Sequence, residues 1–266
     1  MNSKPIIYAH PHPAVTTDVA AFTVEAGALS LLLIQRNEAP FEGTWALPGG
    51  FLRVEYPNND PRRSEQTDDD IDASLSACAS REAKEETGVA PERLEQFGAY
   101  GNQGRDPRGR VVTIGFCALV RHADVRLKAA SDARDARWFP VDQLPTPLAF
   151  DHDRIIKDAL TYIKERAKAD CDFILALAPD EFVFDDYHAL FEAVTGEPID
   201  RANLHKRVHD PRDPGRSLDR PTLNRHIIGK RLTTVNGEKL RHRPPVLYQR
   251  PSAPSAVTSD PPEANS

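Results

Sequence analysis

The chain has 266 residues, of which 39% are hydrophobic and 28% charged, the composition of a globular protein with room for two ordinary domains. No apolar run approaches the roughly 18–20 residues of a membrane-spanning helix, and the N-terminus lacks the pattern of a signal peptide. Cys78, Cys117 and Cys171 are too widely spaced for a disulfide framework or a zinc motif. We therefore expect a cytoplasmic protein with no membrane partner.

Charge is unevenly distributed along the chain. The formal net charge is −6, but residues 196–250 hold 13 Lys/Arg against 6 Asp/Glu, whereas the remainder holds 21 against 34. A basic segment on an otherwise acidic chain predicts a polyanionic partner for that segment alone.

Residues 10–168 are predicted to form an α/β (α+β) domain. Runs of β-branched and aliphatic residues predict strands, and apolar residues at helical spacing predict helices. In chain order we expect strands at 15–24 and 29–36, a Gly- and Pro-rich loop at 40–54, a helix at 71–88, a strand at 110–120, a short strand and turn at 136–145, and a helix at 150–168. The polar tract at about 56–70 has almost nothing apolar to bury, which predicts a mobile surface insertion. Asp72 or Ser74 is expected to cap the first helix, and Gly88 to end it.

Residues 173–250 form a second predicted domain. One helix face is expected to carry Phe184, Tyr187, Leu190, Phe191 and Val194, and a new helix to begin after Pro198. Asn236-Gly237, between two extended segments, is typical of a tight β-hairpin. Helix, helix and basic hairpin is the order of a winged helix-turn-helix. The tail at 251–266 is rich in Pro and Ser and is expected to be disordered.

Two basic segments of this second domain resemble each other. "IDRANLHKRV" (199–208) and "LDRPTLNRHI" (218–227) share Asp-Arg, then Leu, then basic residues and a β-branched aliphatic residue. "HDPRDPGRS" lies between them and breaks any helix. Either segment is a candidate for the helix that enters a groove of DNA.

The stretch "REAKEETGV" places three carboxylates on one side of the first predicted helix. Glu82, Glu85 and Glu86 are related as i, i+3 and i+4, so they share a helix face, where like charges repel. Mg²⁺ would convert that repulsion into binding, because it prefers oxygen ligands and often bridges carboxylates to phosphates. The alternative is a solvated acidic face that Lys84 and Arg81 compensate.

This stretch, together with "GTWALPGGFLRV", resembles the Nudix family, whose box reads G-x5-E-x7-R-E-U-x-E-E-x-G-U. The resemblance covers roughly residues 15–165, includes "LAFDHDRII" near the end of the domain, and implies a Nudix α/β/α sandwich. It implies that Glu82, Glu85 and Glu86 bind divalent metal for diphosphate hydrolysis, with Arg81 orienting them. The box glycine corresponds to Gly50.

Two departures from the box favour binding over turnover. About 17 residues are inserted after Gly50, and Ala73 stands where the box has its first glutamate, so Asp72 or Glu55 would have to replace it. No Glu occurs between Glu95 and Glu165 to supply the further downstream glutamate of many Nudix hydrolases. The candidates to replace that downstream residue are Asp106, Asp132 and Asp135.

"GRDPRGRVVT" (104–113) narrows the resemblance to ADP-ribose-type Nudix proteins and the Nudix-related transcriptional regulators (NrtR). Arginine binds phosphate through two parallel hydrogen bonds, which suits a diphosphate beside a metal site. The alternative is that these arginines pair with Asp106 and neighbouring acids on a surface loop. The candidate ligand-binding residues are Arg36, Gly49, Gly50, Arg105, Arg108 and Arg110.

The resemblance to the NrtR regulators continues through the second domain and implies DNA binding. A recognition helix presents Arg to guanine and Asn to adenine, while a basic wing contacts phosphates. The alternative is a basic surface that serves solubility or domain docking. The candidate DNA-binding residues are Arg201, Asn203, Lys206, Arg207, Arg220, Asn224, Arg225, Lys230, Arg231, Lys239, Arg241 and Arg243.

The sequence therefore predicts a dimeric transcriptional regulator, of the repressor type, for genes of NAD metabolism. Its Nudix domain would sense ADP-ribose or a related nucleotide diphosphate, with Mg²⁺ as the candidate cofactor, and its winged helix would bind double-stranded operator DNA. The alternative is a Mg²⁺-dependent Nudix hydrolase, an ADP-ribose or nucleoside diphosphate pyrophosphatase.

Overall fold

The computed structural model describes residues 11–56, 60–91, 93–124, 127, 133–209, 223–231, 234–235, 238–239 and 246–251. A seven-stranded mixed sheet forms the first unit, and β1 lies beside β6 in parallel at its centre. The strands are β1 (Ala14–Glu25), β2 (Ala28–Arg36), β3 (Trp45–Ala46), β4 (Gly49–Phe51), β5 (Leu94–Tyr100), β6 (Val111–Leu119) and β7 (Ala133–Pro140). Their order is β3-β2-β1-β6-β5, with β4 paired to β1 and β7 paired to β2.

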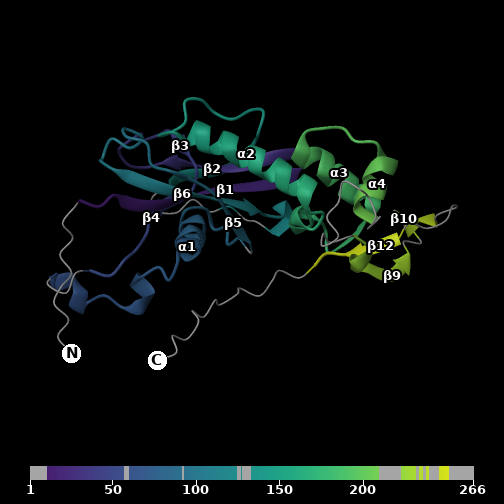
Figure 1. The fold of residues 1–266 in the computed structure, drawn as a ribbon, viewed down its shortest axis with the longest axis horizontal. Helices are drawn as coiled ribbons and strands as arrows, with labels where there is room; N and C mark the ends of the chain where they lie inside the picture. Colours follow the sequence, from purple (N-terminus) through teal and green to yellow (C-terminus); the bar gives the residue numbers. More distant parts are fainter. Residues whose placement is uncertain are drawn as a thin grey trace.

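Two helices cover the two faces of this sheet, α1 (Leu75–Thr87) on one side and α2 (His152–Ala169) on the other (Figure 1). Because successive side chains of a strand point to opposite faces, Val19 packs in the cluster beneath α1, whereas Phe22 packs with Ile155 and Ile163 of α2. Burial on both faces explains why β1 and β2 read as nearly continuous apolar runs. The predicted α/β/α sandwich is confirmed.

The first helix begins later than the sequence pattern indicates. Ser74 accepts the Ala77 N–H at 3.1 Å and caps α1, and Gly88 ends the helix in the left-handed conformation with φ of +77°. Of the two predicted caps, Ser74 fills the role. Asp72 lies before the helix because Arg81 binds its carboxylate.

The polar insertion is folded back on itself over most of its described length. It forms two 3₁₀ turns, η1 (Pro61–Ser64) and η2 (Asp68–Asp70). The Gln66 side chain accepts the Tyr56 N–H at 2.9 Å and donates to the Val54 carbonyl at 2.9 Å. These local hydrogen bonds replace the apolar core that the segment lacks. The mobility that we predicted for this tract remains a prediction.

The second unit combines two helices with short strands. Its elements are η4 (Phe173–Leu177), β8 (Glu181–Val183), α3 (Phe184–Thr195), α4 (Arg201–His209), η5 (Leu223–His226), β9 (Ile227–Arg231), β10 (Thr234–Val235), β11 (Glu238–Lys239) and β12 (Val246–Gln249). Val235 of β10 pairs with Glu238 of β11, and Asn236 and Gly237, the predicted turn residues, lie outside the described residues. The first of the two similar basic segments is α4. In the second similar segment (218–227), only residues 223–227 are described. They form the 3₁₀ turn η5 and the first residue of β9, and not an α-helix.

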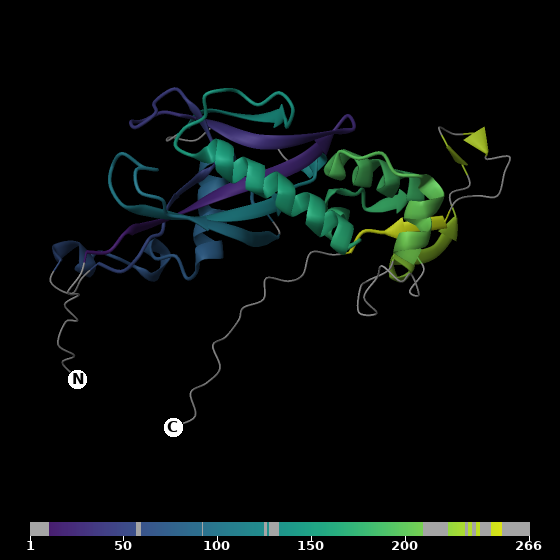
Figure 2. The same ribbon diagram turned by 45° about the horizontal axis from the view of Figure 1, so that its top comes forward.

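One hydrophobic core joins the two units. Phe22 of the sheet and Ile163 of α2 belong to the same buried cluster as Tyr187 of α3, Leu204 of α4 and Tyr248 of β12. Figures 1 and 2 show α2 running from the sheet to α3 and α4. Among the described helices, none is long and apolar enough to cross a membrane.

Candidate functional site

A cavity of about 290 Å³ opens at the end of the sheet where β1, β4 and α1 meet. Its volume is near the lower limit for ligand pockets. The cavity is lined by Thr16, Asp18, Arg36, Glu38, Leu47, Gly49, Gly50, Phe51, Arg53, Glu82, Glu86, Arg105, Asp106, Arg108, Phe150 and His152. Carboxylates and guanidinium groups thus face the same space.

Two of the three predicted metal ligands line this cavity. Glu86 is 9% exposed and accepts the Gly49 N–H at 2.8 Å, and burial raises its pKa to about 8. Burial also raises the pKa of Glu82. Glu85 instead has a half-exposed side chain that pairs with Arg53 and Arg81, both at 3.1 Å. Buried carboxylates facing an open cavity fit a divalent cation such as Mg²⁺, which would hold them ionised.

Gly50 allows the helix to approach the sheet at this point. A Cβ at residue 50 would lie 2.5 Å from the carboxylate carbon of Glu82, far inside van der Waals contact. Any other residue would push the carboxylate of Glu82 out of place. The glycine is therefore required by the position of the carboxylate.

Arg81 holds the acidic residues of α1 in place through contacts with Asp72, Glu82 and the backbone of β4. Its guanidinium binds both oxygens of Asp72, at 2.8 and 2.7 Å, and also contacts Glu82 at 2.6 Å and the Phe51 carbonyl at 3.1 Å. This pairing lowers the pKa of Asp72, whose side chain is 5% exposed. Glu55, the other suggested replacement for the box glutamate, pairs with Arg63 at 3.3 Å instead. Asp72 is thus the acid that supports Arg81.

Three of the four predicted ligand-binding arginines line the cavity, and two of them are already paired. Arg105 is buried and binds Asp151 at 2.8 Å, and Arg108 binds Asp106 at 2.7 Å. The third is Arg36, whose pKa is lowered by burial and by the charge of Arg108. Pairing of Arg105 and Arg108 with nearby acids is therefore observed, and it holds both side chains in the cavity wall; their contact with a ligand stays a prediction. Arg110 is exposed and does not line the cavity.

The three aspartates suggested as a downstream acid differ in position. Asp106 lines the cavity but is held by Arg108. Asp135 pairs with Arg137, and neither residue lines the cavity. Asp132 lies outside the described residues.

Sequence reasoning missed the two buried titratable residues Asp18 and His152, which both line the cavity. His152 Nδ1 accepts the Leu47 N–H at 2.9 Å, so the proton of the neutral ring is on Nε2, 3.7 Å from Asp18 Oδ1. Burial lowers the pKa of His152 and favours this neutral form. A signal was present for Asp18, since it is the single charged residue in the strand "VTTDVAAFTV".

Two aromatic residues, Phe51 and Phe150, line the cavity. The guanidinium of Arg108 lies 4.9 Å from the ring centre of Phe51 and 5.6 Å from that of Phe150, and Phe41 packs edge-on against Phe150 at 4.8 Å. Phe41 and Phe150 both have positive φ, of +65° and +53°. Such backbone is costly for a bulky residue and concentrates at binding sites.

The predicted DNA-binding residues of α4 separate into two groups. Arg201, Asn203 and Lys206 are exposed. Arg207 is partly buried and donates to the Lys168 carbonyl at the end of α2, at 2.6 Å. Arg220, Arg241 and Arg243 lie outside the described residues, as do the side chains of Asn224, Arg225, Lys230, Arg231 and Lys239.

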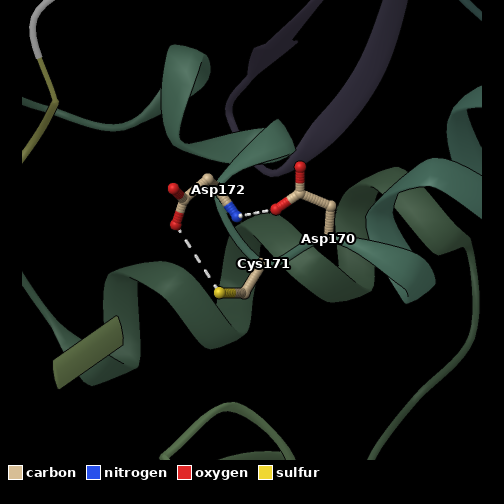
Figure 3. Close-up of side chains that lie close together, drawn as sticks. All are labelled: Asp170, Cys171 and Asp172. Atoms are coloured by element: carbon tan, nitrogen blue, oxygen red, sulfur yellow. Dashed lines mark hydrogen bonds between the residues drawn. The ribbon is translucent and has the colours of Figure 1, made fainter. Parts of the chain in front are cut away.

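Asp170, Cys171 and Asp172 bring their ligand-type atoms within 4.8 Å of one another where α2 ends (Figure 3). The backbone N–H of Asp172 donates to Asp170 Oδ1 at 2.9 Å, and the Cys171 thiol lies 3.6 Å from Asp172 Oδ1. The other oxygen of Asp170 is 3.7 Å from Arg166. These contacts account for the cluster as a turn that stops the helix.

Comparison with known proteins identifies the family. Residues 13–159 match the NUDIX domain family. The ADPR responsive transcriptional repressor NtrR of Acinetobacter baylyi is 30% identical over 200 residues, 75% of this chain and 73% of the relative. An ADP-ribose pyrophosphatase of Methanocaldococcus jannaschii is 36% identical over 151 residues, 57% of this chain and 75% of the relative. The crystal structure of Shewanella oneidensis NrtR with a 27mer DNA is similar at a TM-score of 0.63 and 28% identity, covering 89% of this chain and 93% of that one. The chain therefore belongs to the NUDIX family and, within it, to the Nudix-related transcriptional regulators.

Proposed function

We propose that this protein is a transcriptional repressor whose cavity senses ADP-ribose or a related nucleotide diphosphate and whose second unit binds operator DNA. The observation that carries the proposal is that one cavity combines the carboxylates of partly buried Glu82 and buried Glu86 with the arginines Arg36, Arg105 and Arg108. Its relatives include a repressor described as ADPR responsive. The regulated genes in this proposal concern NAD metabolism.

A diphosphate suits the chemistry of the cavity. The arginines can bind phosphate oxygens through parallel hydrogen bonds, and Mg²⁺ on Glu82 and Glu86 would neutralise the remaining charge. Arg105 and Arg108 would each exchange an aspartate partner for a phosphate, so binding costs little additional desolvation of these two guanidinium groups. Phe51 and Phe150 in the cavity wall offer apolar contact to the rest of the ligand.

DNA binding in this proposal uses α4 and the β10–β11 hairpin. Arg201, Asn203 and Lys206 are exposed on α4, with side chains that suit base edges and phosphates. A related NrtR has been crystallised with a 27mer DNA. We propose a homodimer, because a two-fold protein reads two half-sites of an operator. Such a protein works in the cytoplasm.

Ligand acts on this repressor by shifting a population. A ligand that binds better to the conformation with low DNA affinity lowers DNA binding by its differential affinity for the two conformations. ADP-ribose then releases the operator.

The test uses a duplex that the wild-type protein selects from a randomised library. We expect ADP-ribose with Mg²⁺ to weaken a gel-shift complex of wild-type protein, and AMP, which lacks the diphosphate, to leave it intact. Arg105→Ala should bind the duplex but ignore ADP-ribose. A complex that persists at millimolar ADP-ribose would contradict the proposal.

Hydrolysis is the second candidate function. It is favoured by the arrangement of Glu82 and Glu86 in front of an Arg81 that Asp72 supports, and by the similarity to an ADP-ribose pyrophosphatase. Bound Mg²⁺ would polarise the diphosphate. Incubation with ADP-ribose and Mg²⁺ should then release AMP, and Glu82→Gln should release none. The same AMP release by wild type and Glu82→Gln would exclude this cavity as the catalytic site.

A further inference from the structure

We propose that helix α2 couples the cavity to the DNA-binding helix α4, and that Arg207 is a positioning residue at the far end of this connection. The inference rests on the proposed function and specifies how its two sites communicate. It assigns to Arg207 a role in transmission in place of the DNA contact that its charge suggests.

The first residues of α2 are part of the cavity wall. His152, the first residue of the helix, lines the cavity and binds the Leu47 N–H at 2.9 Å. Asp151, the preceding residue, receives hydrogen bonds from both Nη2 and Nε of Arg105, at 2.8 and 3.1 Å. A phosphate that binds Arg105 competes with Asp151 for the same guanidinium. Ligand occupancy therefore acts directly on the start of α2.

The body of α2 is suited to move as one piece. Eighteen residues at about 1.5 Å each give a helix about 27 Å long. One side is buried, including Ile155, Ala159 and Ile163, which are fully inaccessible. Tyr162 and Arg166 both bind Glu95 of β5, at 2.7 and 2.8 Å. Close-packed helices of this kind shift in small steps of about 1–2 Å rather than bending.

The last turn of α2 contacts α4 of the proposed DNA-binding unit through a hydrogen bond. The final carbonyls of a helix have no partner within the helix, and the Lys168 carbonyl accepts from Arg207 of α4 at 2.6 Å. The Arg207 guanidinium also lies 5.8 Å from the ring centre of Phe191 in α3. Beyond the helix, His226 of η5 contacts Asp172, in the turn of Figure 3, at 3.0 Å. A displacement of this end of α2 must move α4 or break the contact with Arg207.

Arg207 is separated from the candidate DNA contacts by its position on α4. It follows the buried Leu204 by three residues, which puts it towards the packed side of the helix. The neighbouring Lys206 is exposed. Lys206 thus provides a matched control, since its loss removes the same charge from the same helix.

The experiment measures the ratio of DNA dissociation constants with and without saturating ADP-ribose and Mg²⁺, by fluorescence anisotropy on a duplex selected by the wild-type protein. Coupling between two sites is typically 5- to 150-fold, and we expect a wild-type ratio in that range. In Arg207→Met, which keeps apolar contact with Phe191, the ratio should fall to below twofold. Calorimetry should find its ADP-ribose affinity within twofold of wild type. Lys206→Met should weaken DNA binding equally with and without ADP-ribose, so that its ratio stays at the wild-type value.

The outcomes separate the inference from the function on which it rests. A wild-type ratio retained by a folded Arg207→Met variant overturns the inference and leaves the proposed function in place. If the wild-type protein binds DNA with the same dissociation constant with and without ADP-ribose, both the inference and the proposed function are overturned. If Arg207→Met fails to fold, as judged by far-UV circular dichroism, Asp151→Asn tests the other end of α2. Its ratio should also fall, and a ratio unchanged from wild type would again overturn the inference.

Discussion

Glu86→Gln should stabilise the metal-free protein, although it removes a predicted metal ligand. Without metal, burial holds the pKa of Glu86 at about 8 against an ordinary value of 4.5. At pH 7 the Glu86 carboxyl group is ionised in the unfolded chain and protonated in the folded one, so folding takes up a proton. This uptake lowers the free energy of unfolding by about 1.4 kcal/mol for each pH unit between pH 4.5 and pH 7. The free-energy cost of this proton uptake at pH 7 is at most about 3.5 kcal/mol, and we expect about 1–2 kcal/mol because the cavity opens to solvent. Glutamine avoids this cost and can still accept the Gly49 N–H.

The assay is urea unfolding of both proteins in EDTA across pH 4 to 8.5. A raised pKa gives stability that is full below about pH 4.5 and is lost as the pH rises through 8. The advantage of the variant should therefore be absent at pH 4 and largest above pH 8. Added Mg²⁺ should stabilise the wild type and not the variant. A variant less stable than wild type in EDTA at pH 8, or stabilised equally by Mg²⁺, would refute the reasoning.

Three further predictions concern the support of the site, its ligand and DNA. Asp72→Ala should lower the free energy of unfolding, measured in urea, by about 2–3 kcal/mol, because the partly buried Arg81 loses its main carboxylate partner. The control Glu55→Ala should change it by under about 0.5 kcal/mol. Equal effects of the two substitutions would exclude a special role for Asp72. Arg105→Ala should weaken ADP-ribose binding at least tenfold by calorimetry, against less than twofold for exposed Arg110→Ala, and the reverse order would contradict the placement of the diphosphate. Lys206→Ala should reduce by about one the slope of log K for DNA against log salt, and an unchanged slope would remove it from the phosphate contacts.

The parts of the site that sequence could predict are those built by local geometry. The spacing of Glu82, Glu85 and Glu86 sets them on one helix face, and Ser74 and Gly88 mark the ends of that helix. Helical spacing alone could not show that Glu85 turns to Arg53 and Arg81 while Glu86 turns into the cavity. That difference depends on how α1 packs against the sheet.

Residues brought together from distant parts of the chain were beyond sequence reasoning. Asp72 contacts Arg81 although it is a residue away from the box position and follows a long insertion, because the fold of the insertion returns it to the helix. His152 reaches Asp18 across 134 positions of sequence because the first residue of α2 lies beside β1 in the folded chain. Charge alone makes Arg207 a candidate DNA contact, and sequence could not show that it also binds the Lys168 carbonyl, because that contact depends on how the folded chain brings α4 to the end of α2.

We propose that ligand binding in the cavity and DNA binding by the second unit are coupled through one conformational equilibrium. The most direct measurement is calorimetry of ADP-ribose, with Mg²⁺, on the free protein and on the protein saturated with its selected duplex. Coupling is reciprocal, so the account predicts that DNA weakens ADP-ribose binding by the same factor, about 5- to 150-fold, by which ADP-ribose weakens DNA binding. The same ADP-ribose affinity in both samples would contradict it.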